Sequence, residues 1–172
     1  MDELKASIRD IPDFPKKGIL FKDITPLLAD RAVFVKTIDT LKDRYSGKGI
    51  DVVVGIEARG FIFAAALAYA LGAGTVVVRK PGKLPYKTFK QSYALEYGTD
   101  AVEIHQDALQ NGQKIVLIDD VLATGGTVSA TLGLIQSNFR VELVEVAFLI
   151  ELDFLKGREK LKDQPIHSLI HY

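Results

Sequence analysis

The chain has 172 residues, and 48% of them are hydrophobic, which favours a single globular domain over a disordered chain. Its 22 basic and 22 acidic residues balance, so the composition argues against a dedicated nucleic-acid-binding protein. The absence of cysteine excludes disulfides, thiolate nucleophiles and thiolate metal sites.

The N-terminal segment predicts a short helix and then a turn-rich connection. Leu4, Ile8 and Ile11 fall on one helical face, and Pro12 is expected to end this helix. The opening residues MDELKASIRDIPDFP are charged and lack the apolar core of a signal peptide, which fits a cytoplasmic location. Apolar residues at helical spacing over 34–45 predict a second helix, and the buried strand IDVVVGI follows it.

An uncharged run at 61–78, FIFAAALAYALGAGTVVV, is about as long as a membrane span. Gly72 and Gly74 divide this run into an alanine-rich part of helical character and a β-branched part. We therefore predict a helix, a glycine stop and a strand, with no membrane association. Between Lys80 and His105 no helix is evident, which suggests a functional loop or a small hairpin.

The second half of the chain continues the alternation of strands and helices. It reads as the strand KIVLIDD, the helix GGTVSATLGLIQSNF, the strand VELVEVAFLIEL and the edge strand IHSLIHY. The charged run at 156–160 reads as a solvated helix end. Because the strands are continuous apolar runs, we predict an α/β fold with a parallel sheet covered on both faces. Ligands bind such sheets beyond the carboxyl ends of the strands, where this chain has GIEARG and DDVLATGGT.

The segment ATGGT at 123–127 has the character of an anion-binding loop at a helix start. Backbone N–H groups and the helix dipole favour a phosphate there, and Gly125 and Gly126 would let it approach closely. Thr124 and Thr127 add hydroxyl donors. The nucleoside-triphosphate loop is excluded, because a phenylalanine follows the second glycine of GIEARGF where that motif needs lysine, and the dinucleotide motif G-x-G-x-x-G is absent.

Two adjacent acids, Asp119 and Asp120, precede this loop. Carboxylates in contact with a phosphate would repel it, but a few residues upstream they can accept hydrogen bonds from sugar hydroxyls. The alternative, that they only cap a turn, would leave two acids at the end of an apolar strand without a partner. The pattern therefore predicts a site for ribose 5-phosphate.

A basic stretch forms the second anion-binding signal. No acidic residue occurs from Gly60 to Leu95, whereas Arg79, Lys80, Lys83, Lys87 and Lys90 are basic and Arg59 lies just before. A solvated surface and a nucleic-acid site are alternatives, but no nucleic-acid motif surrounds the nearby aromatic residues. A compact polyanion such as pyrophosphate fits better. Together the two sites predict 5-phosphoribosyl 1-pyrophosphate as a ligand.

These segments together resemble the type I phosphoribosyltransferases over nearly the whole chain. The resemblance rests on FPKKGILFKDITPLL, GIEARGF, VRKPGKLP, SYALEYG, VLIDDVLATGGT and IELDFLKGREKL. It implies a single domain over 1–172 with a central, mostly parallel sheet flanked by helices. It also implies a small N-terminal hood formed mainly by about 1–30 and a flexible flap over about 80–104.

The resemblance further implies roles for individual residues. The phosphoribosyl group would be bound by Asp119, Asp120, Ala123, Thr124, Gly125, Gly126 and Thr127. Pyrophosphate would contact Arg59, Arg79, Lys80 and Lys83, with Mg²⁺ held mainly by the substrate's own oxygens and, through water, near Asp119 and Asp120. Adenine would be bound by Leu20, Phe21, Lys22 and Leu152, and the catalytic residue beside the purine ring would be Glu96.

The choice of base rests on Ala123 and Glu96. Relatives that act on 6-oxopurines carry an acid at the position of Ala123, and alanine cannot transfer a proton. Glu96 is the first acid after the basic stretch. The resemblance thus implies that a homodimer converts adenine and 5-phosphoribosyl 1-pyrophosphate to AMP and pyrophosphate, without nucleic acid or membrane. A 6-oxopurine enzyme, for hypoxanthine, guanine or xanthine, and a non-catalytic regulator that senses the sugar pyrophosphate are the alternatives.

Overall fold

The computed structural model of the chain describes residues 2–94 and 98–172. Two compact units make up the chain, and the boundary between them falls between Arg44 and Tyr45. The predicted hood lies within the first unit, and the predicted flap and phosphate loop lie within the second.

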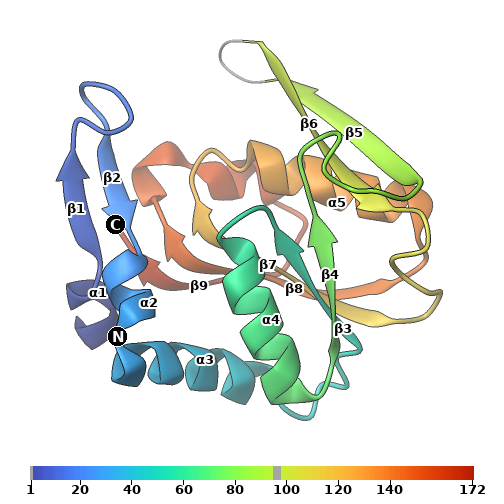
Figure 1. The fold of residues 1–172 in the computed structure, drawn as a ribbon, viewed down its shortest axis with the longest axis horizontal. Coiled ribbons are helices and arrows are strands. Elements are labelled where there is room, and N and C mark those ends of the chain that lie inside the picture. The colour runs from blue at the N-terminus through green and yellow to red at the C-terminus, as the bar shows by residue number, and fades with distance from the viewer. Residues whose placement is uncertain (1, 95–97) are drawn as a thin grey trace. The chain divides into compact units, whose positions relative to one another are not determined.

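The first unit contains a two-stranded antiparallel hairpin. Its elements are α1 (Asp2–Ala6), β1 (Arg9–Pro12), β2 (Leu20–Asp23), α2 (Thr25–Ala29) and α3 (Arg31–Tyr45), the last of which reaches the unit boundary (Figure 1). The predicted helix through Ile11 is wrong beyond Ala6, because residues 9–12 form a strand. These residues pair with β2, and a proline is tolerated at the end of such an edge strand.

The second unit is built on a five-stranded sheet of order β4-β3-β7-β8-β9 (Figure 1). The strands are β3 (Val52–Ile56), β4 (Gly74–Val78), β7 (Lys114–Leu122), β8 (Glu142–Glu151) and β9 (Ile166–His171). Every neighbouring pair is parallel, and β9 lies at the edge. The sequence prediction of a parallel sheet in an α/β fold is therefore confirmed.

Two helices pack against opposite faces of this sheet. On one face lies α4 (Gly60–Leu71), so close that a Cβ built on Gly55 would be 2.7 Å from the Cβ of Ala64. On the other lies α5 (Gly126–Asn138), which shares a buried cluster with Val52 and Val54. Successive strand residues point to opposite faces, so Gly55 faces α4, whereas Val52 and Val54 face α5.

The apolar run at 61–78 folds as the sequence predicts. Helix α4 ends at Leu71, Gly72 caps it in the left-handed conformation with φ of 69°, and β4 begins at Gly74. In the described part of the chain, no helix is long and apolar enough to cross a membrane.

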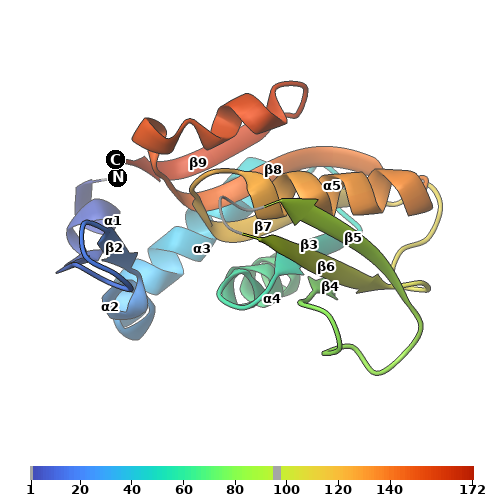
Figure 2. The same cartoon turned by 90° about the horizontal axis from the view of Figure 1, so that it is seen from above.

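The segment between Lys80 and His105 contains a hairpin, one of the two alternatives that the sequence left open. Strands β5 (Thr88–Ala94) and β6 (Thr99–His105) pair antiparallel, and β5 packs along α5 (Figure 2). Two short 3₁₀ helices, η1 (Asp153–Leu155) and η2 (Gly157–Leu161), connect β8 to β9. The carboxyl ends of β3 and β7 lead into α4 and α5. Because these neighbouring strands are parallel, the loops GIEARG and DDVLATGGT lie at the same end of the sheet.

Candidate active site

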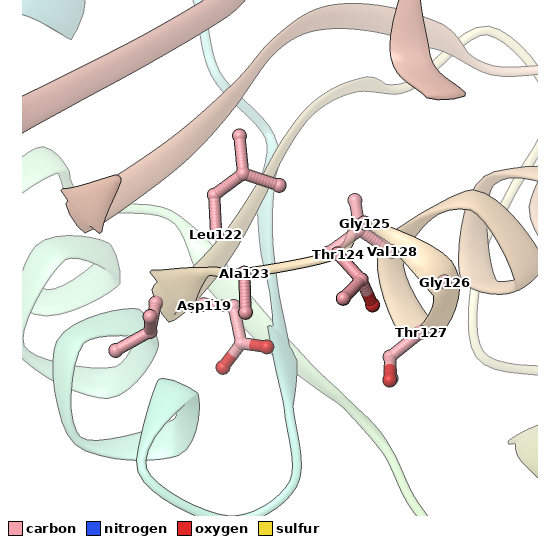
Figure 3. A pocket seen from close by; sticks show the side chains of 9 residues that line it. Asp119, Leu122, Ala123, Thr124, Gly125, Gly126, Thr127 and Val128 are labelled. Atoms are coloured by element: carbon pink, nitrogen blue, oxygen red, sulfur yellow. The ribbon is translucent and has the colours of Figure 1, made fainter. Parts of the chain in front are cut away.

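The predicted phosphate loop forms a small open hollow at the carboxyl end of β7. The hollow encloses about 80 Å³ and is lined by Asp119 and by residues 121–128 (Figure 3). The side-chain oxygens of Asp119, Thr124 and Thr127 lie on one side of the loop, whereas Leu122 points to the other (Figure 3). Gly125 is the N-cap of α5 and has φ of 75°, a left-handed conformation that favours glycine.

The backbone around Gly157 supports this loop from behind. A Cβ built on Gly125 would lie 2.5 Å from the carbonyl oxygen of Gly157, and a Cβ on Gly157 would overlap the carbonyl oxygen of Ala123. The two glycines thus allow main chain to pack on main chain. At Gly126, a Cβ would lie 3.7 Å from the ring of Tyr93 and 4.0 Å from Oγ1 of Thr124, both ordinary contacts, so neither crowding nor an unusual φ requires glycine there.

Arg158 fixes the supporting segment in place. Its Nε and Nη2 donate to the two carboxylate oxygens of Glu151 at 2.9 and 2.6 Å, and Ser168 donates to the same group at 2.6 Å. The Arg158 hydrogen bonds outweigh burial and lower the pKa of Glu151, which keeps the pair charged. Residues 156–160 are therefore more than the solvated helix end that the sequence predicted, because Gly157 packs against the phosphate loop.

Asp119 and Asp120 have different surroundings. Asp119 is half-buried and lines the hollow, and its Oδ1 accepts the backbone N–H of Asp120 at 2.9 Å. Asp120 is 5% exposed, and its Oδ2 lies 2.6 Å from Nε of Arg59. Burial raises the pKa of both acids; for Asp119 the neighbouring carboxylate of Asp120 adds to this rise, whereas for Asp120 the guanidinium of Arg59 opposes it.

Gly60 lets α4 begin directly against these acids. A Cβ on this residue would lie 2.9 Å from both Oδ1 of Asp119 and the carbonyl oxygen of Ile118. The glycine that ends GIEARG is thus needed for close packing between the loop after β3 and the end of β7.

Glu57 organises the basic loop that follows β4. Its carboxylate accepts the backbone N–H of Lys80 at 2.7 Å and a hydrogen bond from Nζ of Lys83, and Nε of Arg79 lies 3.4 Å away. Three of the four predicted pyrophosphate residues therefore converge on one acid, and the fourth, Arg59, pairs with Asp120. Burial acts to raise the pKa of Glu57, but the hydrogen bonds and the nearby positive charges outweigh it and lower the pKa.

In the described part of the chain, two buried side-chain atoms lack a hydrogen bond of good geometry. They are the donor Nε of Arg79 and the acceptor Oδ2 of Asp120. Buried polar atoms in proteins are almost always hydrogen-bonded, and exceptions concentrate at functional sites. Each atom nevertheless lies near an opposite charge, Nε of Arg79 at 3.4 Å from Glu57 and Oδ2 of Asp120 at 2.6 Å from Nε of Arg59, and both residues are ones that the resemblance assigns to the sugar pyrophosphate.

The residues predicted to bind the base lie on two elements. Leu20 is exposed, Phe21 packs edge-on against Phe14 with ring centroids 5.1 Å apart, and the buried Lys22 pairs with Asp10 at 2.7 Å. All of these belong to the β1–β2 hairpin and the loop that joins its strands.

Leu152 follows β8 in the second unit. Its backbone N–H donates to the carbonyl oxygen of Leu122 at 2.9 Å, which holds it beside the phosphate loop. Glu96, the predicted catalytic residue, lies outside the described residues.

Replacing Glu57 with glutamine is expected to destabilise the protein by about 1.5–3 kcal/mol at neutral pH, the range for hydrogen bonds to charged groups. Because the folded-state pKa lies below the usual value of 4.5, this stabilisation is present above about pH 4.5 and is lost as pH falls through the folded-state pKa. Denaturant unfolding of both proteins should therefore show a difference that shrinks in acid. If the difference in unfolding free energy between the two proteins did not depend on pH, the charged carboxylate of Glu57 would not be the source of the stabilisation.

Comparison with known proteins agrees with this geometry. Residues 26–168 match the phosphoribosyl transferase domain family. The chain is 60% identical to the adenine phosphoribosyltransferase of Geotalea uraniireducens and 61% identical to that of Geobacter metallireducens, over the full length of each pair.

Solved structures show the same likeness. A crystal structure of adenine phosphoribosyltransferase from Thermoanaerobacter pseudethanolicus has a TM-score of 0.95 and 52% identity, with 99% of each chain covered. The Saccharomyces cerevisiae enzyme, complexed with an imino-altritol bisphosphate and adenine, has a TM-score of 0.91 and 43% identity, with 98% of this chain and 97% of that chain covered. The chain therefore belongs to the phosphoribosyl transferase family and, within it, to the adenine phosphoribosyltransferases.

Proposed function

We propose that the protein transfers the 5-phosphoribosyl group of 5-phosphoribosyl 1-pyrophosphate to N9 of adenine, giving AMP and pyrophosphate. The observation that carries this proposal is that the Asp119 carboxylate and the loop at 123–127 line one hollow. That arrangement suits the hydroxyls and the phosphate of a single sugar phosphate. The names and high identity of the relatives support adenine as the acceptor.

Each group of residues then has a part in binding. The loop 123–127 holds the 5′-phosphate through backbone N–H groups and hydroxyls, and Asp119 and Asp120 accept hydrogen bonds from the ribose hydroxyls. The diphosphate is received by Arg59, Arg79, Lys80 and Lys83. Adenine is bound by main-chain and apolar groups of Leu20, Phe21, Lys22 and Leu152.

The chemistry requires no covalent intermediate with the protein. N9 of adenine attacks the anomeric carbon as the bond to pyrophosphate breaks, through a state of oxocarbenium character. The protein orients the two substrates, stabilises the negative charge that develops on the leaving group, and excludes water that would hydrolyse the sugar. Positive charges held in place by Glu57 need little reorganisation as the diphosphate departs.

Mg²⁺ fits the donor set of this site. Asp119 and Asp120 are adjacent carboxyl groups whose pKa values burial raises, so a nearby divalent cation would favour their charged forms. Oxygen donors of this kind suit Mg²⁺, which keeps several waters and binds substrate phosphates. When bound, the ion neutralises part of the diphosphate charge. Asp119 and Asp120 would hold it through water.

Pyrophosphate release with each purine in turn tests the proposal. We expect adenine to support AMP formation from 5-phosphoribosyl 1-pyrophosphate, and hypoxanthine, guanine and xanthine to support little. Preference for a 6-oxopurine would overturn the choice of base. Tight binding of the sugar pyrophosphate without turnover of any purine would instead indicate a regulator.

The proposal includes a cytoplasmic homodimer that uses no nucleic acid and no membrane. The equal numbers of acidic and basic residues, 22 each, support the absence of nucleic acid as a partner. Sedimentation of the purified protein tests the assembly state.

Asp119→Asn is expected to weaken transition-state stabilisation by about 1.5–3 kcal/mol, the range for hydrogen bonds to charged groups. The amide keeps the shape and one acceptor but loses the negative charge that faces the sugar. Steady-state kinetics with 5-phosphoribosyl 1-pyrophosphate measures this as a fall in kcat/KM. A covalent adduct between the sugar and Asp119 in the wild-type protein would contradict the binding role.

A further inference from the structure

Lys80 has a carboxylate partner of its own in the β5–β6 hairpin. Nζ of Lys80 donates to Oδ2 of Asp100 and, at 3.0 Å, to the hydroxyl of Tyr93. Tyr93 and Asp100 lie directly opposite each other in the β5–β6 ladder, and the Tyr93 hydroxyl donates to the same Oδ2 at 3.1 Å. The ammonium of Lys80, the hydroxyl of Tyr93 and the carboxylate of Asp100 are therefore all hydrogen-bonded to one another.

These three hydrogen-bonded groups reach the phosphate loop. The Tyr93 hydroxyl also lies 3.0 Å from Oγ1 of Thr127, and since its proton goes to Asp100, the Thr127 hydroxyl is the donor in that contact. A lysine from the basic loop after β4 and a threonine from the phosphate loop are thus joined through one tyrosine. These are the residues assigned to opposite ends of 5-phosphoribosyl 1-pyrophosphate.

Asp100 supplies the kind of acceptor that a diphosphate supplies. Both are anionic oxygens, and an ammonium has only three donors, two of which already serve Asp100 and Tyr93. The side chains of Lys80 and Asp100 are 35% and 31% exposed, so water and an incoming anion can reach the pair. The ion pair is consequently weak enough to exchange.

We propose that Asp100 is a positioning residue that holds the Lys80 ammonium until the diphosphate of the substrate competes for it, and that it thereby lowers the affinity for the sugar pyrophosphate. This inference rests on the proposed function, because it takes Lys80 as a diphosphate ligand. If Asp100 only stabilised the hairpin, its replacement would weaken binding of the sugar pyrophosphate. The proposal instead expects the replacement to strengthen that binding.

Asp100→Asn provides the test, with titration calorimetry on the full chain. The probes are 5-phosphoribosyl 1-pyrophosphate with Mg²⁺ and ribose 5-phosphate, which lacks the diphosphate. A partly exposed ion pair is worth little, so we expect the Kd for the sugar pyrophosphate to fall by about threefold, with no change for ribose 5-phosphate. Asp107→Asn removes the same charge from an exposed site just beyond β6 and should change neither.

A double-mutant cycle shows whether the effect passes through Lys80. In a Lys80→Met background, Asp100→Asn should no longer tighten binding. A Kd for the sugar pyrophosphate that is unchanged or higher in Asp100→Asn, or a decrease that persists without Lys80, would overturn the inference. Wild-type protein that binds the sugar pyrophosphate but forms no AMP would overturn the proposed function alone.

Discussion

Gly157→Ala is expected to lower kcat/KM for 5-phosphoribosyl 1-pyrophosphate by about 10²-fold, the loss that a shift of roughly 1 Å at a binding group can cause. The added methyl would overlap the carbonyl oxygen of Ala123, and backbone cannot yield as a flexible side chain does. One of the two segments must move.

The phosphate loop is the segment expected to move. The Gly157 segment is held by the paired hydrogen bonds of Arg158 to Glu151, a carboxylate buried at the end of β8. The loop at 123–125 has no comparable pair of charged hydrogen bonds among the described residues. Displacement of Ala123 would redirect the backbone N–H groups that follow it, and with them the phosphate site.

Gly133→Ala is the matched control for this substitution. Gly133 lies inside α5, and a Cβ there would meet nothing within 4 Å, so alanine should stabilise the helix by up to about 1 kcal/mol without loss of activity. Circular dichroism would show that both variants fold, and ribose 5-phosphate titration would locate the loss at the phosphate site. A folded Gly157→Ala protein with wild-type kcat/KM would show that this packing does not control the loop.

Local signals in the sequence were enough to predict the sheet and its two loops. The buried run of β3 and the glycine stop at Gly72 are both features of neighbouring residues. The absence of a helix pattern between Lys80 and His105 left a functional loop or a small hairpin as alternatives, and the structure contains a hairpin there. The identity of the relatives confirms the family that the loop motifs indicated.

The supporting contacts could not be predicted in the same way, because they join residues far apart in the chain. Glu57 receives Lys80 and Lys83, more than twenty positions later, and nothing in GIEARG marks it as their acceptor. Gly157 lies in a charged run whose local pattern indicates only solvent exposure. At the N-terminus, the strand at 9–12 depends on its pairing with β2 and overrides a helical spacing of apolar residues.

The basic residues predicted to bind the diphosphate are paired with acids, which the composition alone does not reveal. Each predicted diphosphate residue has an acidic neighbour: Arg59 has Asp120, Lys80 has Asp100, and Arg79 and Lys83 share Glu57. For Arg79 and Lys83, pairing with Glu57 fixes long, flexible side chains before the ligand arrives and reduces the entropy lost on binding, whereas Asp100 competes with the ligand for Lys80. The basic stretch is therefore an ordered anion site within a protein whose charges balance.

Glu96→Gln is expected to reduce kcat with adenine by about 10²-fold, the lower end of the range for general acid–base catalysis. N9 of adenine must lose its proton as it attacks the sugar, and the resemblance to the family assigns the carboxyl of Glu96 to the purine ring. Alanine at position 123 leaves the phosphate loop without an acid that could replace it. The phosphate and diphosphate sites would still orient the sugar, which is why the loss should stay near the lower limit.

Two comparisons separate catalysis by Glu96 from a general effect of charge. Glu142→Gln removes an exposed carboxylate at the amino end of β8, paired with Lys114 at the opposite end of β7 from the phosphate loop, and should leave kcat unchanged. Glu96→Leu, which cannot hydrogen-bond the ring, should lower kcat further and raise KM for adenine. Titration should give the same Kd for 5-phosphoribosyl 1-pyrophosphate in all of these proteins. If both Glu96 variants turned over adenine at the wild-type rate, the proton would have to leave through another group, and the main-chain groups near Leu20 would become the candidates.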